Sequence, residues 1–355
     1  MQNRKPIAFI NGDGGTGRVA QMVRETIFKN FPTIDKSLSV ESRLDSKDTC
    51  IDEAGTILNM CGAGFKNSTA SDDSRIKEAG LLSANIIMRP MMGAYAMLRL
   101  LQGPGRYASA CGTLRFASGG IYDEQSCVQK NIDGRNVAVI TQHMDLDALV
   151  LFAELAVQLA REHGLHLVLS SKSTICASEL LFRTTVENIW KEHGLKAGNA
   201  EDWSGDFHHE LTDMLLARLP VVNTDSDRFG KGGFLHVADN ANGDSSSDII
   251  DIQHGNHVMC SRMYCKNSGS KMFTYEELPG GTANRMTTGK LCGENFLNPI
   301  GIIFAMASAF EQVNPEDKAF FDAVRSKALE YIDEVPENER DTEEMIRVIC
   351  MKQPV

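Results

Sequence analysis

The sequence predicts an α/β protein with two domains and a largely parallel sheet. The chain has 355 residues, which allows two domains because one domain usually takes about 100–200 residues. Short apolar runs that end in turn residues alternate with amphipathic helical segments, an order typical of parallel strands joined by crossover helices. Apolar residues make up 42% of the chain and charged residues 23%, an ordinary composition for a folded globular protein.

Apolar spacing predicts the individual elements in chain order. A short apolar run that ends in a glycine-rich turn is read as a buried strand, and apolar residues three or four positions apart are read as a helix. Asp145 is expected to cap one helix, and Gly164 is expected to follow its last turn. The predicted strands are 6–10, 136–140 and 165–169, and the predicted helices are 19–28, 146–162, a segment through 190, 300–310 and 319–331, with a final short turn after the acidic stretch 333–344. Residues 101–120 and 239–281 are expected to be irregular.

Charge and cysteine content exclude several classes of protein. The net charge of −11 and the sequence pI near 5.3 argue against nucleic-acid binding, because an acidic surface repels a phosphate backbone. No apolar run approaches the roughly 20 residues that a membrane helix needs, and the first residues do not resemble a signal peptide. The nine cysteines show no framework spacing, so we expect free thiols and a cytoplasmic location.

A glycine motif follows the first predicted strand. Gly12-x-Gly14-x-x-Gly17 opens a helix, and Glu41 lies at a distance suited to a ribose contact, so a Rossmann dinucleotide site is one interpretation. The alternative is a glycine-rich turn that only lets backbone segments approach closely.

The most informative segment contains two aspartates. In Asn240-Ala-Asn-Gly-Asp-Ser-Ser-Ser-Asp248, a helix that begins near Gly243 places Asp244 and Asp248 one turn apart on one face. Such carboxylates repel each other unless a cation lies between them, and oxygen ligands suit Mg²⁺ or Mn²⁺. The alternative is a solvated acidic loop with a helix cap.

These motifs, taken together and in order, resemble the β-decarboxylating dehydrogenases, the family of isocitrate, 3-isopropylmalate and tartrate dehydrogenases. The segment 240–248 resembles the metal motif of that family, and Gly12-Asp13-Gly14 resembles its opening turn. Further similar elements are Arg115 with Ile121-Tyr122, Lys172-Ser-Thr-Ile, Leu181-Phe-Arg183, Thr212-Asp213, Gly281-Thr-Ala283 and Asn298-Pro299. The resemblance covers residues 6 to about 310 and disfavours the Rossmann interpretation, because this family binds its nucleotide on another fold.

The resemblance implies a role for each matching residue. Lys172 is the expected base for the substrate hydroxyl, and Tyr122 the expected acid that protonates C3. Asp213, Asp244 and Asp248 are the expected ligands of Mg²⁺ or Mn²⁺, which polarises the ketone intermediate; Asp213 is counted among the catalytic residues as well. The expected substrate contacts are Arg99, Arg115, Arg106 and Tyr95, and the expected cofactor contacts are Gly281, Thr282, Ala283, Arg285, Asn298 and Asn240.

The sequence also departs from the family pattern. Cys111 stands where the family has a second substrate arginine, and Arg106 is near enough to compensate. Gly93-Ala94-Tyr95 stands where isocitrate enzymes show S-x-N, so we expect a malate-type substrate rather than isocitrate. Arg285 suits a 2′-phosphate, which favours NADP over NAD.

The resemblance implies the isocitrate/isopropylmalate dehydrogenase-like two-domain α/β fold, with a mixed, largely parallel sheet. Residues 1–95 with 255–355 are the expected large cofactor-binding domain, and 96–254 the small domain that carries the dimer interface and the catalytic residues. It further implies a homodimer in which Lys172 and Asp213 of one subunit complete the site around Tyr122 of the other. The expected reaction is NAD(P)-linked oxidation and decarboxylation of a 3-substituted malate-type 2-hydroxy acid.

Two alternatives stay open. A non-catalytic, regulatory paralogue fits the missing arginine, but Tyr122, Lys172 and the three aspartates argue against it. A zinc site at His254, His257, Cys260 and Cys265 has suitable residue types, but its spacing matches no standard motif.

Overall fold

The computed structural model divides the chain into two compact units, residues 1–93 with 257–355 and residues 94–256. The boundaries expected from the sequence were 95/96 and 254/255. The structure describes residues 7–11, 14–30, 39–43, 49–61, 63–67, 84–101, 111–122, 124–222, 233–253, 260–266, 272–277, 299–313, 315–336 and 339–351. Among the described residues, every helix is too short or too polar to cross a lipid bilayer.

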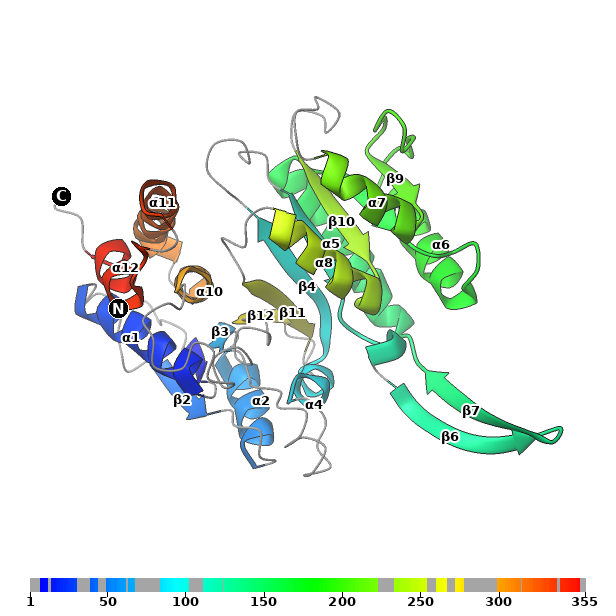
Figure 1. Cartoon of the computed structure of the whole chain (residues 1–355), viewed down its shortest axis with the longest axis horizontal. Helices are drawn as coiled ribbons and strands as arrows, with labels where there is room; N and C mark the ends of the chain where they lie inside the picture. Colours follow the sequence, from blue (N-terminus) through cyan, green and yellow to red (C-terminus); the bar gives the residue numbers. More distant parts are fainter. Residues whose placement is uncertain are drawn as a thin grey trace. The chain divides into compact units, whose positions relative to one another are not determined.

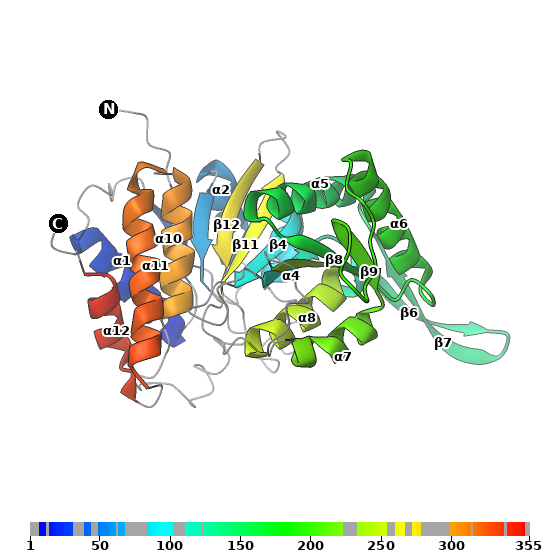
Figure 2. The same ribbon diagram turned by 90° about the horizontal axis from the view of Figure 1, so that it is seen from above.

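The unit 94–256 is a sheet covered by helices on both faces. Its strand order is β4-β5-β10-β8-β9, and Figure 1 labels β4, β10 and β9 of this sheet. β4 and β5 are antiparallel, and the other neighbours are parallel. Helices α5 and α6 cover one face, and α7 and α8 cover the other (Figure 2). The bounds are β4 (Ala94–Leu101), β5 (Cys111–Phe116), β8 (His166–Ser170), β9 (Phe207–Glu210), β10 (Phe234–Ala238), α5 (Leu146–His163), α6 (Ala177–Glu192), α7 (Thr212–Val222) and α8 (Asn240–Gln253).

Local signals explain the placement of α5. The Asp145 carboxylate accepts hydrogen bonds from the backbone N–H groups of Asp147 and Ala148, and Gly164 ends the helix in the left-handed region at φ 66°. Both caps were predicted and are confirmed. The buried face of α5 packs Phe152 against Phe116 and Phe182, with ring centroids 5.3 and 5.9 Å apart.

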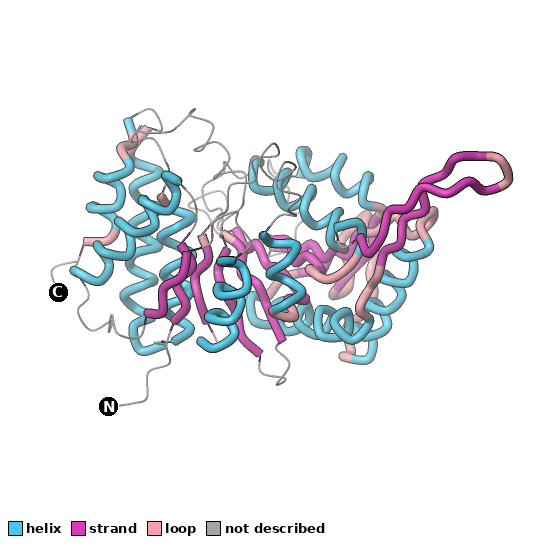
Figure 3. Tube along the Cα trace, turned by 90° about the horizontal axis from the view of Figure 1, so that it is seen from below, coloured by secondary structure: helices cyan, strands magenta, loops and turns pink. Residues whose placement is uncertain are grey.

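One predicted connection is wrong. The strand expected at 136–140 belongs to β7 (Arg135–Gln142), which pairs antiparallel with β6 (Glu124–Ile132) in a separate two-stranded sheet that projects from the unit (Figure 3). Asp133 and Gly134 join the strands with φ of 51° and 75°, as in a tight hairpin turn whose twist matches the strands. The apolar run is therefore half of a hairpin, not the first strand of a parallel crossover.

The unit formed by 1–93 and 257–355 has the strand order β2-β1-β3-β12-β11, in which only β11 and β12 pair antiparallel among the described strands. Its helices α1, α10, α11 and α12 enclose an apolar core with β1 (Figure 2). The bounds are β1 (Ile7–Asn11), α1 (Gly14–Asn30), β2 (Ser39–Arg43), α2 (Thr49–Cys61), β3 (Ala63–Lys66), α4 (Ala84–Met91), β11 (Ser261–Lys266), β12 (Met272–Glu277), α10 (Ile300–Val313), α11 (Lys318–Glu334) and α12 (Thr342–Ile349).

The stretches expected to be irregular contain regular elements. Residues 239–281 include α8, β11 and β12, and residues 101–120 include β5. Helix α8 begins at Asn240, three positions before the expected start. The polar composition that suggested a loop at 240–248 belongs to a helix, because Ser246 and Ser247 bond backbone carbonyls three residues earlier in α8.

Two serines at the end of β8 bond histidines on the neighbouring strands. Ser170 Oγ lies 2.6 Å from Nε2 of His236 in β10, and Ser171 Oγ lies 2.9 Å from Nε2 of His209 in β9. Burial lowers the pKa of His236 to about 3. Burial, followed by the positive charge of Arg183, lowers the pKa of His209 to about 4. Both rings are therefore neutral at pH 7.

These histidines predict an acid-sensitive fold. Each has a lower pKa folded than the ordinary 6.5, so below pH 6.5 the unfolded chain binds protons that the folded chain does not. The stability that the neutral rings provide is fully present above pH 6.5 and is lost as the pH falls towards 3 or 4. Between pH 7 and pH 5 the free energy of unfolding should therefore fall by about 2 kcal/mol less in His236→Gln than in the natural protein.

The measurement is urea unfolding between pH 7 and pH 5. The readout is the slope of the free energy of unfolding against pH, because the substitution by Gln also changes that free energy at every pH. A variant of the exposed His143 is the control and should keep the slope of the natural protein. An unchanged slope in His236→Gln would contradict the prediction.

Candidate functional site

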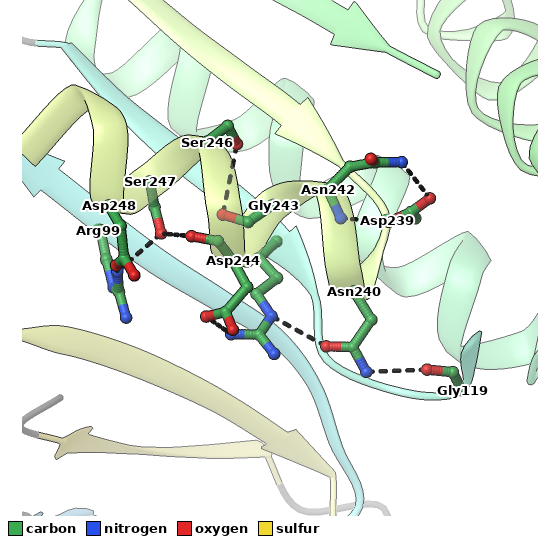
Figure 4. Close-up of polar contacts among 11 residues, drawn as sticks. Arg99, Gly119, Asp239, Asn240, Asn242, Gly243, Asp244, Ser246, Ser247 and Asp248 are labelled. Atoms are coloured by element: carbon green, nitrogen blue, oxygen red, sulfur yellow. Dashed lines mark hydrogen bonds and ion pairs between the residues drawn. The ribbon is translucent and has the colours of Figure 1, made fainter. Parts of the chain in front are cut away.

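The two predicted metal aspartates lie on α8, and each is paired with an arginine from the adjacent strands. Arg115 of β5 forms an ion pair with Asp244, and Arg99 of β4 lies 2.5 Å from Asp248 (Figure 4). Arg99 also donates to Ser247 Oγ at 2.7 Å. The side chains of Asp244 and Asp248 are 33% and 59% exposed, so carboxylate oxygens remain accessible to a ligand. We call these four residues the acid–arginine cluster.

Strand register explains why both arginines reach the helix. Arg115 is opposite Met97 and Arg99 is opposite Thr113, so both arginines lie on one face of the antiparallel pair. Gly243 lets α8 approach that face closely, because a Cβ there would lie 2.8 Å from Cβ of Arg115. A larger residue at this position would push the helix away from the arginine.

Asn240 holds Arg115 in place. Its Oδ1 accepts from Arg115 Nε at 2.9 Å, and its Nδ2 donates to the carbonyl of Gly119 at 2.8 Å (Figure 4). The side chain is buried, with 6% of the residue exposed. Asn240 therefore fixes the guanidinium, and its expected contact with the cofactor stays a prediction.

Tyr122 lies beside this cluster in the short helix η3 (Gly120–Tyr122). The Arg115 guanidinium lies 5.3 Å from its ring centroid, within the range of a cation–π contact. The pKa of the Tyr122 hydroxyl is raised, first by burial and then by the negative charge of Asp244. Tyr122 therefore keeps its hydroxyl proton at pH 7, and 40% of the residue's surface is exposed.

Lys172 and Asp213 form a second group, which we call the lysine pair. Lys172 follows β8, Asp213 lies in the first turn of α7, and their side chains form an ion pair that lowers the pKa of Asp213. The backbone N–H of Lys172 donates to the carboxylate of Glu179, which also accepts from Asn242 Nδ2 at 3.1 Å. Glu179 therefore connects the lysine segment to α8.

The structure does not bring all the predicted metal ligands together in one chain. Among the described residues, no group of three or more His, Cys, Asp or Glu side chains is placed to hold a metal ion. Asp244 and Asp248 share the acid–arginine cluster, whereas Asp213 pairs with Lys172. The sequence had predicted that Asp213 serves the site of a second subunit.

Tyr95 differs from its expected setting. The segment Gly93–Tyr95 was read as a substrate loop, but β4 already begins at Ala94 and Tyr95 is 4% exposed. Gly93 is the turn before this strand, at φ 60°. The expected loop is therefore the start of a buried strand.

Several predicted residues lie outside the described part of the chain. They are Arg106, Gly281, Thr282, Ala283, Arg285 and Asn298, together with His254 and His257 of the alternative zinc site. Of that zinc site, only Cys260 and Cys265 are described; Cys265 is buried and Cys260 is partly exposed.

The sequence reading missed the residues that hold the site together. Glu179 and Asn242 link its segments, and Ser170, His236 and Ser246 form a buried chain between β8 and α8. The adjacent Ser170-Ser171-Lys172 was a visible signal, but its histidine partners are 66 and 38 residues away in sequence.

Comparisons with known proteins agree with the predicted family. The family model described as isocitrate/isopropylmalate dehydrogenase matches residues 106–347. A peroxisomal NADP isocitrate dehydrogenase of Candida tropicalis is 24% identical over 343 residues, covering 85% of this chain and 80% of that protein. The 3-isopropylmalate dehydrogenase 1 of Bordetella bronchiseptica is 26% identical over 254 residues, covering 66% and 61%.

A solved structure gives the same fold. The isocitrate dehydrogenase from Ostreococcus tauri, in complex with isocitrate and magnesium(II), matches with a TM-score of 0.77 and 19% identity over 98% of both chains. This match confirms the predicted two-domain α/β fold class with a mostly parallel sheet. The family model covers more than half of the chain, and the chain therefore belongs to the isocitrate/isopropylmalate dehydrogenase family.

Proposed function

We propose that the protein catalyses metal-dependent, NAD(P)-linked oxidation and decarboxylation of a malate-type 2-hydroxy acid substituted at C3. The acid–arginine cluster beside Tyr122 carries this proposal, because it gathers metal-ligating carboxylates, carboxylate-binding guanidinium groups and a proton donor on one face of the sheet. Isocitrate and 3-isopropylmalate, which appear in the names of the similar proteins, are both 3-substituted malates.

The carboxylates of the cluster fit a hard divalent cation. Asp244 and Asp248 are one turn apart on α8 and are partly exposed, and Mg²⁺ and Mn²⁺ prefer such oxygen ligands. Asp213 is the third proposed ligand. When bound, the cation supplies a Lewis acid for the ketone formed at C2, and the nicotinamide supplies the hydride acceptor.

The protein's own residues bind the substrate and move its protons. Arg99 and Arg115 bind substrate carboxylates by charge-assisted hydrogen bonds. The base role requires Lys172 in its neutral form: with Asp213 bound to the cation in place of the ion pair, and the ammonium proton released to solvent, Lys172 would accept the proton of the C2 hydroxyl as the hydride leaves C2. After CO₂ has left C3, the Tyr122 hydroxyl donates a proton to that carbon; its raised pKa keeps the hydroxyl protonated for this step.

We further propose NADP as the preferred nicotinamide cofactor over NAD. Arg285 stands where a basic residue suits a 2′-phosphate, and the similar protein from Candida tropicalis is named as an NADP enzyme. In this proposal, residues 1–95 with 255–355 bind the cofactor. A cytoplasmic location stays a prediction, since the Candida tropicalis protein is named as peroxisomal.

A homodimer completes the proposed site. The acid–arginine cluster and the lysine pair are separate groups in one chain, so the lysine pair of one subunit would serve the cluster of the other. The hairpin of β6 and β7 supports association, because Val128, Ile132 and Ile140 expose 47%, 44% and 51% of their surface. An isolated two-stranded sheet is marginally stable in water, and a second subunit would cover these apolar side chains.

The proposed substrate preference excludes isocitrate as the best substrate. The two guanidinium groups of the acid–arginine cluster suit two substrate carboxylates, and Tyr95, buried in β4, offers no contact for a third. Leaving that charge desolvated would cost several kcal/mol. A hydrogen, hydroxyl or alkyl substituent at C3 carries no such cost.

The test is a panel of malate, tartrate, 3-isopropylmalate and isocitrate with Mg²⁺ or Mn²⁺ and either NADP⁺ or NAD⁺. We expect turnover with a higher kcat/KM for a dicarboxylate than for isocitrate.

Replacing Lys172 by Ala should lower kcat by about 10²–10⁴, the usual contribution of a general base. The variant Lys191→Ala removes an exposed lysine of α6 and should behave like the natural protein.

Three other results would contradict parts of the proposed function. If isocitrate were best by tenfold or more, the proposed preference for a dicarboxylate would be wrong. If the protein bound metal but turned over no hydroxy acid, it would be the non-catalytic paralogue. Unchanged turnover in Lys172→Ala would remove Lys172 from its proposed role.

A further inference from the structure

A buried hydrogen-bond chain links the lysine segment to the metal-binding helix. Ser170, two residues before Lys172, contacts Nε2 of His236 at 2.6 Å, and Nδ1 of the same ring contacts Ser246 Oγ at 3.1 Å. Ser246 lies on α8 midway between Asp244 and Asp248. Ser170, His236 and Ser246 are all 0% exposed, so water does not compete for these bonds.

The contacts of Ser246 assign a direction to this chain. With the Ser246 proton assigned to the carbonyl of Gly243 at 3.4 Å, the 3.1 Å contact with His236 is assigned to Nδ1–H as donor. A neutral imidazole carries one N–H, which leaves Nε2 as an acceptor for the Ser170 hydroxyl. The chain therefore runs from Ser170 through His236 and Ser246 to Gly243, the residue where α8 touches Arg115.

We propose that His236 is a positioning residue that sets the Lys172 segment and the Asp244–Asp248 face of α8 relative to each other. This inference rests on the proposed function, because the Lys172 segment and the α8 face belong to the two groups that form the proposed sites of the dimer. The ring joins two strands, β8 and β10, each of which runs directly into a segment with reactive side chains. A residue that only filled space here would need no polar atoms.

The lowered pKa agrees with this geometry. Burial keeps the His236 ring neutral at pH 7, and the neutral ring is the form that donates at one nitrogen and accepts at the other. Losing either bond would leave a buried polar group unsatisfied.

Two side chains replace the two nitrogens separately. The amide of Asn reaches the position of Nδ1, so His236→Asn keeps a partner for Ser246 and loses the one for Ser170. The amide of Gln reaches the position of Nε2, so His236→Gln does the reverse. Ser246→Ala and Ser170→Ala remove the same bonds from the outer ends and leave the ring in place, in case a substitution of His236 prevents folding.

The experiment measures Mn²⁺ affinity by calorimetry without substrate, and kcat at saturating Mn²⁺ with the best substrate of the panel. We expect Ser246→Ala and His236→Gln to weaken Mn²⁺ binding about tenfold, a larger change than in kcat. Ser170→Ala and His236→Asn should lower kcat about tenfold, a larger change than in Mn²⁺ affinity. The control Ser245→Ala removes an exposed hydroxyl of α8 and should change neither quantity.

A nitrogen-15 NMR measurement of the ring provides a readout that needs no turnover. In the natural protein at pH 7 the His236 signals should report a protonated Nδ1 and an unprotonated Nε2. The opposite tautomer, or variants that change kcat and Mn²⁺ affinity by the same factor, would overturn the inference. If the natural protein bound no Mn²⁺ and turned over no substrate, the proposed function itself would fail.

Discussion

The site depends on the neutralisation of two like charges on one helix face. Asp244 and Asp248 are one turn apart on α8 and would repel each other, but Arg115 and Arg99 place a guanidinium beside each. This pairing requires the antiparallel register of β4 and β5, which turns both arginines to the same side. It also requires Gly243, because any larger side chain there would collide with Arg115. The two ion pairs therefore depend on both the register of β4 and β5 and the glycine at position 243.

The same pairing connects the structure to the proposed reaction. Guanidinium groups that neutralise carboxylates also suit a dicarboxylate substrate, and a divalent cation would take over the neutralisation of Asp244 and Asp248. When the cation pairs with the aspartates and the substrate carboxylates pair with the arginines, the net charge of the site stays nearly zero. The lysine pair lies in a different group of the same chain, and the proposed shared dimer site would account for that separation.

Local chemistry made part of the structure predictable. The aspartates of α8 share a face because of their four-residue spacing, and Asp145 and Gly164 cap α5 because each acts on its own neighbours. The hairpin of β6 and β7 was missed because an apolar run does not reveal whether its partner strand is parallel. Asp133-Gly134, a common hairpin turn, was the available signal. The partners of Ser170 and Asn240 were not predictable, since tertiary pairing across 66 and 125 residues brings them to His236 and Arg115.

Subunit complementation tests the shared site most directly. Chains with Lys172→Ala and chains with Asp248→Asn, each inactive alone, are expressed together so that mixed dimers form. A site built from the lysine pair of one subunit and the acid–arginine cluster of the other is intact once in each mixed dimer, so about a quarter of the natural activity should return. If every residue of a site came from a single chain, mixing would restore no activity and would contradict this account.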